Sequence, residues 1–407
     1  MAAHSVIGFS GAERYLMCPG SIRVSRGIKS VDSEYAAQGT AAHALAEHCL
    51  RTALAPAEFL GQWIDSENTI CLNQPNTEGA YRIDADMVAA VEMYQEYVFA
   101  QMVEGDRLYV EVRFHLPDIH DDLFGTADAV IYSPSRRLLI IIDFKYGAGV
   151  PVEVVESVQL GGYALGAATG EWVGQDNPIG PVSEVRLVIV QPRAFHAGGP
   201  IRPWSMSMAE MADLRETFRV GTHLTDTDDA PLAIGDWCRW CPGAAVCPKQ
   251  IEEVEDAMPD VPDEKNFDPA RVSQSLDWVK KAKARIKIIE QFAEAQATRL
   301  GVKFPGYKVV QGEGNRVFRD EIAVGHKLLS EGLAVDEVFT EPVPAQLKSV
   351  AQVEEVLGKK VFADLLGDLI VRPETKLQLV PEKDKRPAVA IDPKAGFTAV
   401  ASENPFD

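Results

Sequence analysis

Four cysteines at the two ends of a long segment constrain the fold of this chain more than any other feature. Cys238, Cys241 and Cys247 stand close together in WCRWCPGAAVCP, and Cys18 lies about 220 positions earlier. These residues can share one ligand site only if the chain between them folds into one unit whose two ends meet. The spacing therefore predicts a single N-terminal domain closed by a cysteine site.

The composition is that of an ordinary globular protein. The chain has 407 residues, 46% of them hydrophobic and 25% charged, which is enough for two domains with buried cores. No stretch approaches the roughly 18 unbroken apolar residues of a membrane span, and the first residues lack the pattern of a secretion signal. We expect a cytoplasmic protein without a membrane partner. Its thiols would be reduced there, which favours a metal or cluster over disulfides.

The net charge of −20 counts against nonspecific binding of nucleic acid, which depends mainly on neutralising phosphates. The acidic excess gathers in patches at 118–122, 225–230 and 252–264, away from a basic run on a predicted helix. These basic residues are candidates for contacting a DNA backbone, and a solvated helix face explains them equally well: Lys280, Lys281, Lys283, Arg285 and Lys287.

The hydrophobic pattern predicts an α/β fold with a mixed sheet flanked by helices. After the N-terminal helices come three strand-like runs, and then a helix that crosses over to a returning strand. The expected helices cover 11–17, 40–54, 86–103 and 153–168, and the expected strands cover 108–116, 123–132, 138–145 and 184–191.

A stretch rich in proline and acidic residues predicts a linker at 258–267. It would separate a domain over 1–257 from a mainly helical extension over 268–380, which a polar tail over 381–407 follows. Within the extension we expect a long helix that ends at Gly301, and a hairpin over 307–318.

The connection SPSRR predicts a hairpin that brings two aspartates together. If residues 134–137 form its loop, paired positions sum to 271, and Asp128 lies directly opposite Asp143. Lys145 is two residues beyond Asp143 and therefore on the same face. Two neighbouring carboxylates favour a hard divalent cation such as Mg²⁺ or Mn²⁺. By itself, however, a D-x-K sequence after an apolar run is more often only the end of a strand.

Two helical pairs add candidate residues. His43 and Glu47 are four positions apart on one predicted helix, so that a histidine is available as a further ligand. Gln159 and Tyr163 are likewise four apart on the helix after the Lys145 strand, where they could grip a phosphate or a base. Each pair taken alone is also compatible with a purely structural role.

These motifs together resemble the PD-(D/E)XK nucleases of the RecB-like branch. The matching segments, in chain order, are GTAAHALAE, FGTADAV, IIIDFKYG and QLGGY. The resemblance implies that His43, Asp128 and Asp143 bind metal, that the carbonyl of Phe144 is a further ligand, and that Lys145 is catalytic. Gln159 and Tyr163 would position the strand. Glu111, on the first expected strand, is either an additional acid or part of a surface salt bridge.

The cysteine spacing resembles that of the AddB-type and CRISPR-adaptation RecB-like nucleases. In those proteins one N-terminal cysteine and a C-terminal group hold a [4Fe-4S] cluster, which implies an iron-sulfur staple formed by Cys18, Cys238, Cys241 and Cys247. Four thiolates could equally hold Zn²⁺. Trp237 and Trp240 are candidates to shield the site from solvent. Phage-encoded members of this branch share the opening segment, which implies a bacterial host cytoplasm.

The sequence thus predicts a metal-dependent DNA exonuclease that processes ends in replication or recombination. The alternative is a noncatalytic DNA-binding or scaffold protein with a four-cysteine zinc staple. No helicase phosphate loop appears, so unwinding would need a partner such as a helicase, a single-strand-binding protein or a recombination protein. A homo-oligomer is compatible with the long helix.

Overall fold

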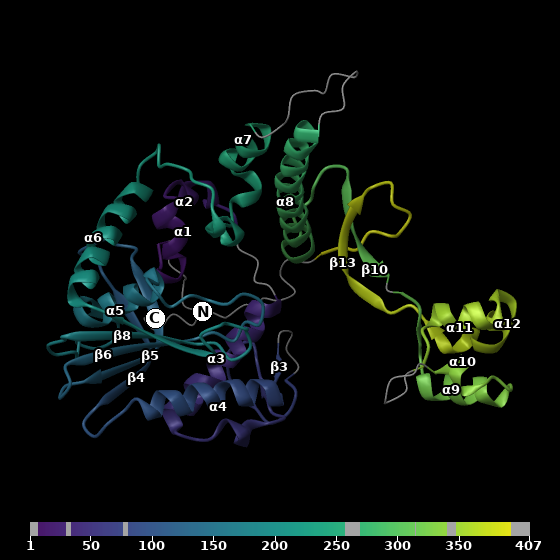
Figure 1. Ribbon diagram of the computed structural model, residues 1–407, viewed down its shortest axis with the longest axis horizontal. Coiled ribbons are helices and arrows are strands. Elements are labelled where there is room, and N and C mark those ends of the chain that lie inside the picture. The colour runs from purple at the N-terminus through teal and green to yellow at the C-terminus, as the bar shows by residue number, and fades with distance from the viewer. Residues whose placement is uncertain are drawn as a thin grey trace, which may run out of the picture. The chain divides into compact units, whose positions relative to one another are not determined.

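The protein is described here by a computed structural model in which the chain forms two compact units, Met1–Ile288 and Ile289–Asp407. The boundary falls inside the long helix α8 (Pro269–Leu300). The expected linker at 258–267 lies outside the described residues. The residues that the structure describes are 7–29, 34–75, 80–256, 269–313, 315–339 and 347–391 (Figure 1).

The first unit is built on a six-stranded sheet with the strand order β7-β4-β5-β6-β8-β9. All neighbouring strands are antiparallel except β6 and β8, which are parallel. A parallel pair needs a crossover, and α5 (Val158–Thr169) provides it, as the sequence predicted. The strands are β4 (Arg107–His115), β5 (Phe124–Ser133), β6 (Leu138–Phe144), β7 (Glu171–Trp172), β8 (Glu184–Val190) and β9 (Ile201–Met206).

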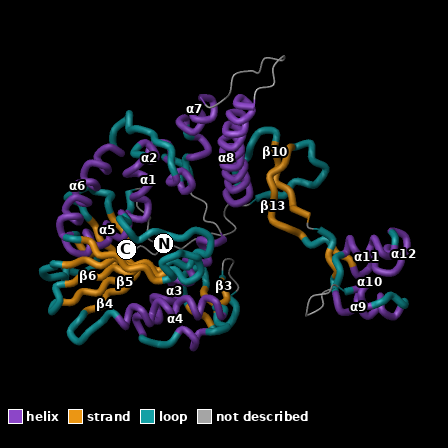
Figure 2. The backbone as a smooth tube through the Cα atoms, in the orientation of Figure 1, coloured by secondary structure: helices purple, strands orange, loops and turns teal. Residues whose placement is uncertain are grey.

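Helices cover both faces of this sheet (Figures 1 and 2). On β6, Leu139 and Ile141 join the core beneath α1, α5 and α6, whereas Ile140 and Ile142 join the core beneath α3 and α4. This alternation explains why β6 is apolar throughout, since both of its faces are buried. The expected mixed α/β architecture is therefore confirmed. The covering helices are α1 (Ala12–Met17), α3 (Glu34–Thr52), α4 (Ala85–Ala100) and α6 (Met208–Thr225).

Local capping fixes where these helices begin. Ser157 accepts a hydrogen bond from the main-chain N–H of Leu160, and α5 starts at Val158. The sequence had placed this start at residue 153. It lies later because Glu156 has a φ of 56°, a left-handed conformation that a helix cannot contain. Asp84 caps α4 in the same way, through the N–H of Met87.

Smaller elements complete the first unit. A three-stranded sheet has the order β2-β1-β3, and two 3₁₀ helices lie in the segment that carries the last three cysteines of the chain. The bounds are α2 (Gly20–Ser25), β1 (Trp63–Ile64), β2 (Ile70–Cys71), β3 (Tyr81–Arg82), η1 (Phe9–Gly11), η2 (Pro56–Phe59), η3 (Asp236–Trp240), η4 (Ala244–Val246) and α7 (Pro248–Asp256).

Among the described residues of the second unit, the strands do not pair as the expected hairpin over 307–318. Instead, β10 (Tyr307–Glu313) pairs with β13 (Glu374–Pro381), and β11 (Val317–Phe318) pairs with β12 (Ile370–Val371). The pairing of β10 with the distant β13 is longer than a local hairpin would allow, and Val310 is completely buried. A small core gathers the helices α9 (Glu321–Ser330), α10 (Val335–Val338), α11 (Val350–Leu357) and α12 (Lys359–Leu366), with η5 (Gly367–Leu369) beside them.

Within the part of the chain that is described, no helix combines the length and the apolar character needed to cross a membrane.

Candidate functional site

The hairpin of β5 and β6 brings Asp128 and Asp143 together at its open end. The observed pairs run from Ala129 with Ile142 to Ser133 with Leu138, which is the predicted register. The next pair along is Asp128 with Asp143. There the main-chain N–H of Phe144 donates to Oδ2 of Asp128 at 2.7 Å, which fixes that carboxylate.

Glu111 reaches the same place from β4. The pairs of β4 with β5 on either side of it leave Glu111 opposite Asp128. Glu111 has a φ of 51°, in the left-handed region that non-glycine residues rarely adopt inside a strand. Such backbone strain persists only where the surroundings impose it, and it is common at functional sites. The sequence had left Glu111 between an accessory acid and a surface salt bridge, and the structure puts it at the centre of the site.

His43, Glu111 and Asp128 form a group that could hold a metal ion. Each offers one ligand atom, and these atoms all lie within 4.8 Å of one another. His43 projects from α3, and its Nδ1 lies 3.4 Å from Oδ1 of Asp128. One imidazole and two carboxylates from three different elements thus converge, a donor set suited to a divalent cation.

The electrostatics of this group show an excess of negative charge. Burial opposes protonation of His43, but the Asp128 carboxylate outweighs it and raises the pKa of His43 to about 9. Burial and then Asp128 raise the pKa of Glu111 to about 8. Two neighbouring carboxylates repel each other when both are ionised, and a bound cation would relieve this repulsion.

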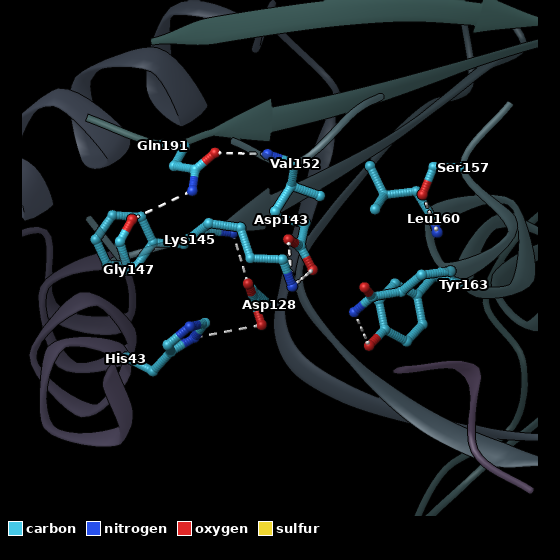
Figure 3. Close-up of polar contacts among 12 residues, drawn as sticks. His43, Asp128, Asp143, Lys145, Gly147, Val152, Ser157, Leu160, Tyr163 and Gln191 are labelled. Atoms are coloured by element: carbon cyan, nitrogen blue, oxygen red, sulfur yellow. Dashed lines mark hydrogen bonds and ion pairs between the residues drawn. The ribbon is translucent and has the colours of Figure 1, made fainter. Parts of the chain in front are cut away.

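Asp143 holds Lys145 rather than joining the group of three (Figure 3). Lys145 Nζ lies 2.9 Å from Oδ2 and 3.3 Å from Oδ1 of Asp143. The Asp143 carboxylate is buried, with 2% of the residue exposed. Its burial raises its pKa, even though Lys145 acts in the opposite direction. The sequence had predicted Asp143 as a metal ligand; here its described contact is with the lysine.

These side chains border a cavity of about 470 Å³. The group of three and Lys145 all line it, and the side chains of His43 and Lys145 are 31% and 26% exposed. Glu47 lines it as well, while its carboxylate accepts from Arg51 Nε at 2.9 Å. The remaining lining residues are Gly39, Thr40, Ala44, Asn68, Tyr146 and Gly147.

Gln159 and Tyr163 bond to each other beside this centre. Gln159 Nε2 donates to the Tyr163 hydroxyl at 3.0 Å, and the Tyr163 ring packs edge-on against Phe9 at 5.6 Å. Tyr163 is buried, and its pKa is raised by that burial and by Asp143. Neither residue is among those that line the cavity. The pair therefore lies near Asp143 but outside the cavity.

Tyr94 is a residue of the centre that sequence reasoning missed. Its ring stacks on Phe144 at 4.8 Å, and its hydroxyl is buried without a hydrogen-bond partner. Its pKa is raised by burial and then by Asp128, Glu111 and Asp143, which places these carboxylates nearby. Its position on an expected helix gave no signal of this role.

The four cysteines that were expected to come together line a second pocket. Cys18, Cys238, Cys241 and Cys247 all line it and are free thiols. The N–H of Ala233 donates to Cys18 Sγ at 3.3 Å, and Cys241 Sγ lies 3.7 Å from Ser25 Oγ. The other lining residues are Ser21, Val24, Leu232, Ala233, Trp237, Ala244 and Gln250.

Across the described ranges, the group of three candidate metal ligands that converges is His43, Glu111 and Asp128, and no group of cysteines converges as closely. Four thiolates on one tetrahedral zinc ion, at Zn–S of about 2.3 Å, would be only about 3.8 Å apart. Trp237 lines the pocket, whereas Trp240 is 68% exposed and does not shield it as expected.

The basic run of α8 is divided between two environments. Arg285 is only 8% exposed and donates to the main-chain carbonyls of Ala244 and Ala245, between Cys241 and Cys247. The prediction that Arg285 contacts DNA is therefore wrong, because its guanidinium is used to anchor α8 on the cysteine segment. Lys281 pairs with Glu253 at 2.6 Å, and the other members of the run are exposed: Lys280, Lys283 and Lys287.

A comparison with protein families gives one match over nearly the whole chain. The family is described as Protein of unknown function (DUF2800), and its model matches residues 4–387, which include both pockets and most of the second unit. The chain therefore belongs to the DUF2800 family.

Proposed function

We propose that this protein is a metal-dependent deoxyribonuclease, an exonuclease that processes DNA ends in replication or recombination. The observation that carries the proposal is the convergence of His43, Glu111 and Asp128 within 4.8 Å, in one cavity with Lys145. The resemblance of the surrounding motifs to the RecB-like PD-(D/E)XK nucleases supports the same chemistry.

His43, Glu111 and Asp128 would hold Mg²⁺ or Mn²⁺. When bound, such an ion lowers the pKa of a coordinated water and polarises a phosphate oxygen. Lys145 carries its positive charge into the cavity, where it can offset negative charge that develops on a phosphate. Asp143 and the Phe144 N–H keep Lys145 and Asp128 in place, so that no group must reorganise during the reaction.

The metal ligands proposed here differ in one respect from those that the motif resemblance implies. Asp143 is proposed as a positioning residue for Lys145, and Glu111 replaces it as a metal ligand. Glu111 and Asp143 are carboxylates on β4 and β6, the two strands that flank β5, so the number of acidic ligands is unchanged. This exchange gives the strained backbone of Glu111 a function.

For the cysteine pocket we propose a [4Fe-4S] cluster. Each thiolate of such a cluster binds a different iron atom, so the sulfurs stand farther apart than around a single ion. The cysteine spacing, which resembles that of the iron-sulfur RecB-like nucleases, supports this choice over Zn²⁺. Bound there, the cluster would tie the start of the first unit to its end.

A noncatalytic DNA-binding or scaffold protein with a zinc staple is the second candidate. The net charge of −20 favours it, because a strongly acidic protein repels DNA at long range. If the protein is a nuclease, its binding of DNA must therefore depend on local contacts at the cavity and not on the overall electrostatic field.

The deciding experiment combines a spectrum with a digestion. Protein purified without oxygen should show the broad visible absorption of an iron-sulfur cluster, and should degrade end-labelled DNA in Mg²⁺ or Mn²⁺ but not in EDTA. Asp128→Asn should remove cleavage, whereas Asp176→Asn, at an exposed aspartate, should not. A colourless, zinc-bound protein that leaves DNA intact would support the scaffold instead.

A further inference from the structure

The loop that joins β8 to β9, residues 191–200, starts next to Lys145. It leaves β8 at Val190, whose carbonyl accepts the main-chain N–H of Lys145 at 2.9 Å. None of its residues lines the acidic cavity itself, so the loop begins at the border of the cavity and leads away from it.

The loop is held rigidly by two buried polar side chains. Gln191 is 2% exposed; it donates to the carbonyl of Gly147 and accepts the N–H of Val152 (Figure 3). It also donates to the carbonyl of Val150. Arg202 is 4% exposed and donates to Gln191, Val152 and Gly199. These bonds fasten the loop to the segment that follows Lys145.

On this braced loop, Phe195 is 93% exposed. Its neighbour Ala194 is buried, so the backbone is packed down while the ring points outward. A single exposed apolar residue on a mobile surface needs no explanation. A large aromatic ring presented by a braced backbone, two positions from a residue that packs on the cavity lining, is suited to contact with a ligand.

Arg193, two positions earlier, supplies a positive charge at the same place. Its guanidinium lies 4.3 Å from the centre of the Tyr146 ring, and Tyr146 lines the acidic cavity. In the described structure no carboxylate stands within ion-pair distance of Arg193. Since two residues span at most about 7 Å of chain, one ligand can touch both side chains.

We propose that Arg193 and Phe195 form a subsite for the unpaired end of a DNA strand, Arg193 contacting a phosphate and Phe195 stacking on a base. The proposal rests on the nuclease function and adds its substrate class. A flat ring recognises any base whose face is uncovered, whereas the bases of a duplex already cover each other. A cation and an aromatic ring side by side match the two parts of a nucleotide.

Binding is tested by fluorescence anisotropy with a 5′-fluorescein oligothymidylate and with a blunt duplex, both in Ca²⁺. Phe195→Ala should weaken single-strand binding about tenfold to a hundredfold, and Phe195→Trp should restore it. Arg193→Met should weaken binding and lower the slope of log K against log salt by about one. The matched control is Val173→Ala, at an exposed apolar residue next to the opposite edge strand β7.

The subsite is overturned if Phe195→Ala binds the single strand as the parent does, or if the single strand and the blunt duplex lose affinity equally. Hydrolysis of a small phosphodiester without a base, methyl p-nitrophenyl phosphate, separates this outcome from failure of the nuclease function. Phe195→Ala should leave that hydrolysis unchanged. If the parent protein does not hydrolyse it in Mn²⁺ but Phe195→Ala still weakens strand binding, the subsite stands and the nuclease function fails.

Discussion

The acidic centre and the cysteine pocket belong to the same compact unit but are assembled in different ways. The acidic centre takes Glu111, Asp128 and Asp143 from three consecutive strands, and only His43 comes from farther away. The cysteine pocket joins Cys18 to residues beyond the whole sheet. The first depends on strand register, whereas the second depends on completion of the fold.

The two sites also differ in charge. At the acidic centre, carboxylates are forced together, so that the protein without metal contains electrostatic strain. At the pocket, burial raises the pKa of the Cys18 thiol, which favours the uncharged form until a ligand binds. Changes at the acidic centre should therefore affect chemistry more than stability. Changes at the pocket should do the reverse.

The largest effect is expected from Lys145→Met. Loss of the only described cation of the centre other than His43 should lower kcat/KM for DNA cleavage by about a hundredfold to a thousandfold or more. The melting temperature should fall to a lesser degree, because the buried Asp143 carboxylate loses its partner. Lys287→Met is the control at an exposed lysine. A Lys145→Met protein with parental cleavage would remove this site from consideration.

Cys18→Ser should affect stability more than catalysis. The variant should lose most of its iron, and its melting temperature should fall by about 5 °C or more, since a ligand that binds only the folded state stabilises it. Elemental analysis and calorimetry measure the two effects. Cys71→Ser, at a cysteine outside the pocket, should change neither. Equal metal content in Cys18→Ser and the parent would show that Cys18 is not a ligand.

Arg285→Met tests the link between α8 and the cysteine segment. Two main-chain carbonyls would lose their donors, at a cost of about 2 kcal/mol in the free energy of unfolding. Hydrogen exchange in residues 269–288 should become faster, while the salt dependence of DNA binding stays the same. Unchanged exchange together with a lower salt slope would instead restore Arg285 as a DNA contact.

Glu111→Gln should give the smallest effect on stability, and a pH-dependent one. The pKa of Glu111 is raised from an ordinary 4.5 to about 8, so the folded protein binds more protons than the unfolded one between these values. Its contribution to stability is therefore complete below about pH 4.5 and is lost as the pH rises towards 8.

Denaturation curves in EDTA at pH 5 and pH 8.5 measure this difference. The parent should lose stability over the interval, and Glu111→Gln should lose about 1 kcal/mol less. The pKa of His43 is raised to about 9, in part by Glu111, so His43 also loses less stability over this interval in Glu111→Gln and adds to the difference in the same direction. A larger loss of stability in Glu111→Gln than in the parent would contradict the conclusion that neighbouring carboxylates raise the pKa of Glu111.

Much of the site could be predicted because it is local. The loop of the β5–β6 hairpin fixed which residues pair, and the period of a strand fixed which side chains share a face. The same reasoning could not find the role of Glu111. Its strand has an ordinary apolar pattern, and the left-handed backbone that redirects it has no sequence signal in a non-glycine residue.

Side chains with several possible partners could not be assigned in advance. Asp143 was predicted to bind metal because of its position, but Lys145 is two residues away and competes for the same oxygens. Arg285 was one of five similar basic residues on a helix, and nothing in their spacing showed which of them faces the cysteine segment. The turn-like segment after β10 predicted a local hairpin, whereas a distant strand provided the longer match.

The sequence alone determined the mixed α/β architecture, the opposition of Asp128 and Asp143, and the need for Cys18 to meet the other three cysteines. Periodicity and loop length carry this information, since they act between neighbours in the chain. Only the tertiary structure decided that Glu111 joins His43 and Asp128, that Asp143 holds Lys145, and that Arg285 is buried. Those outcomes depend on which side chains compete for the same space and charge, and that competition exists only after distant segments have packed together.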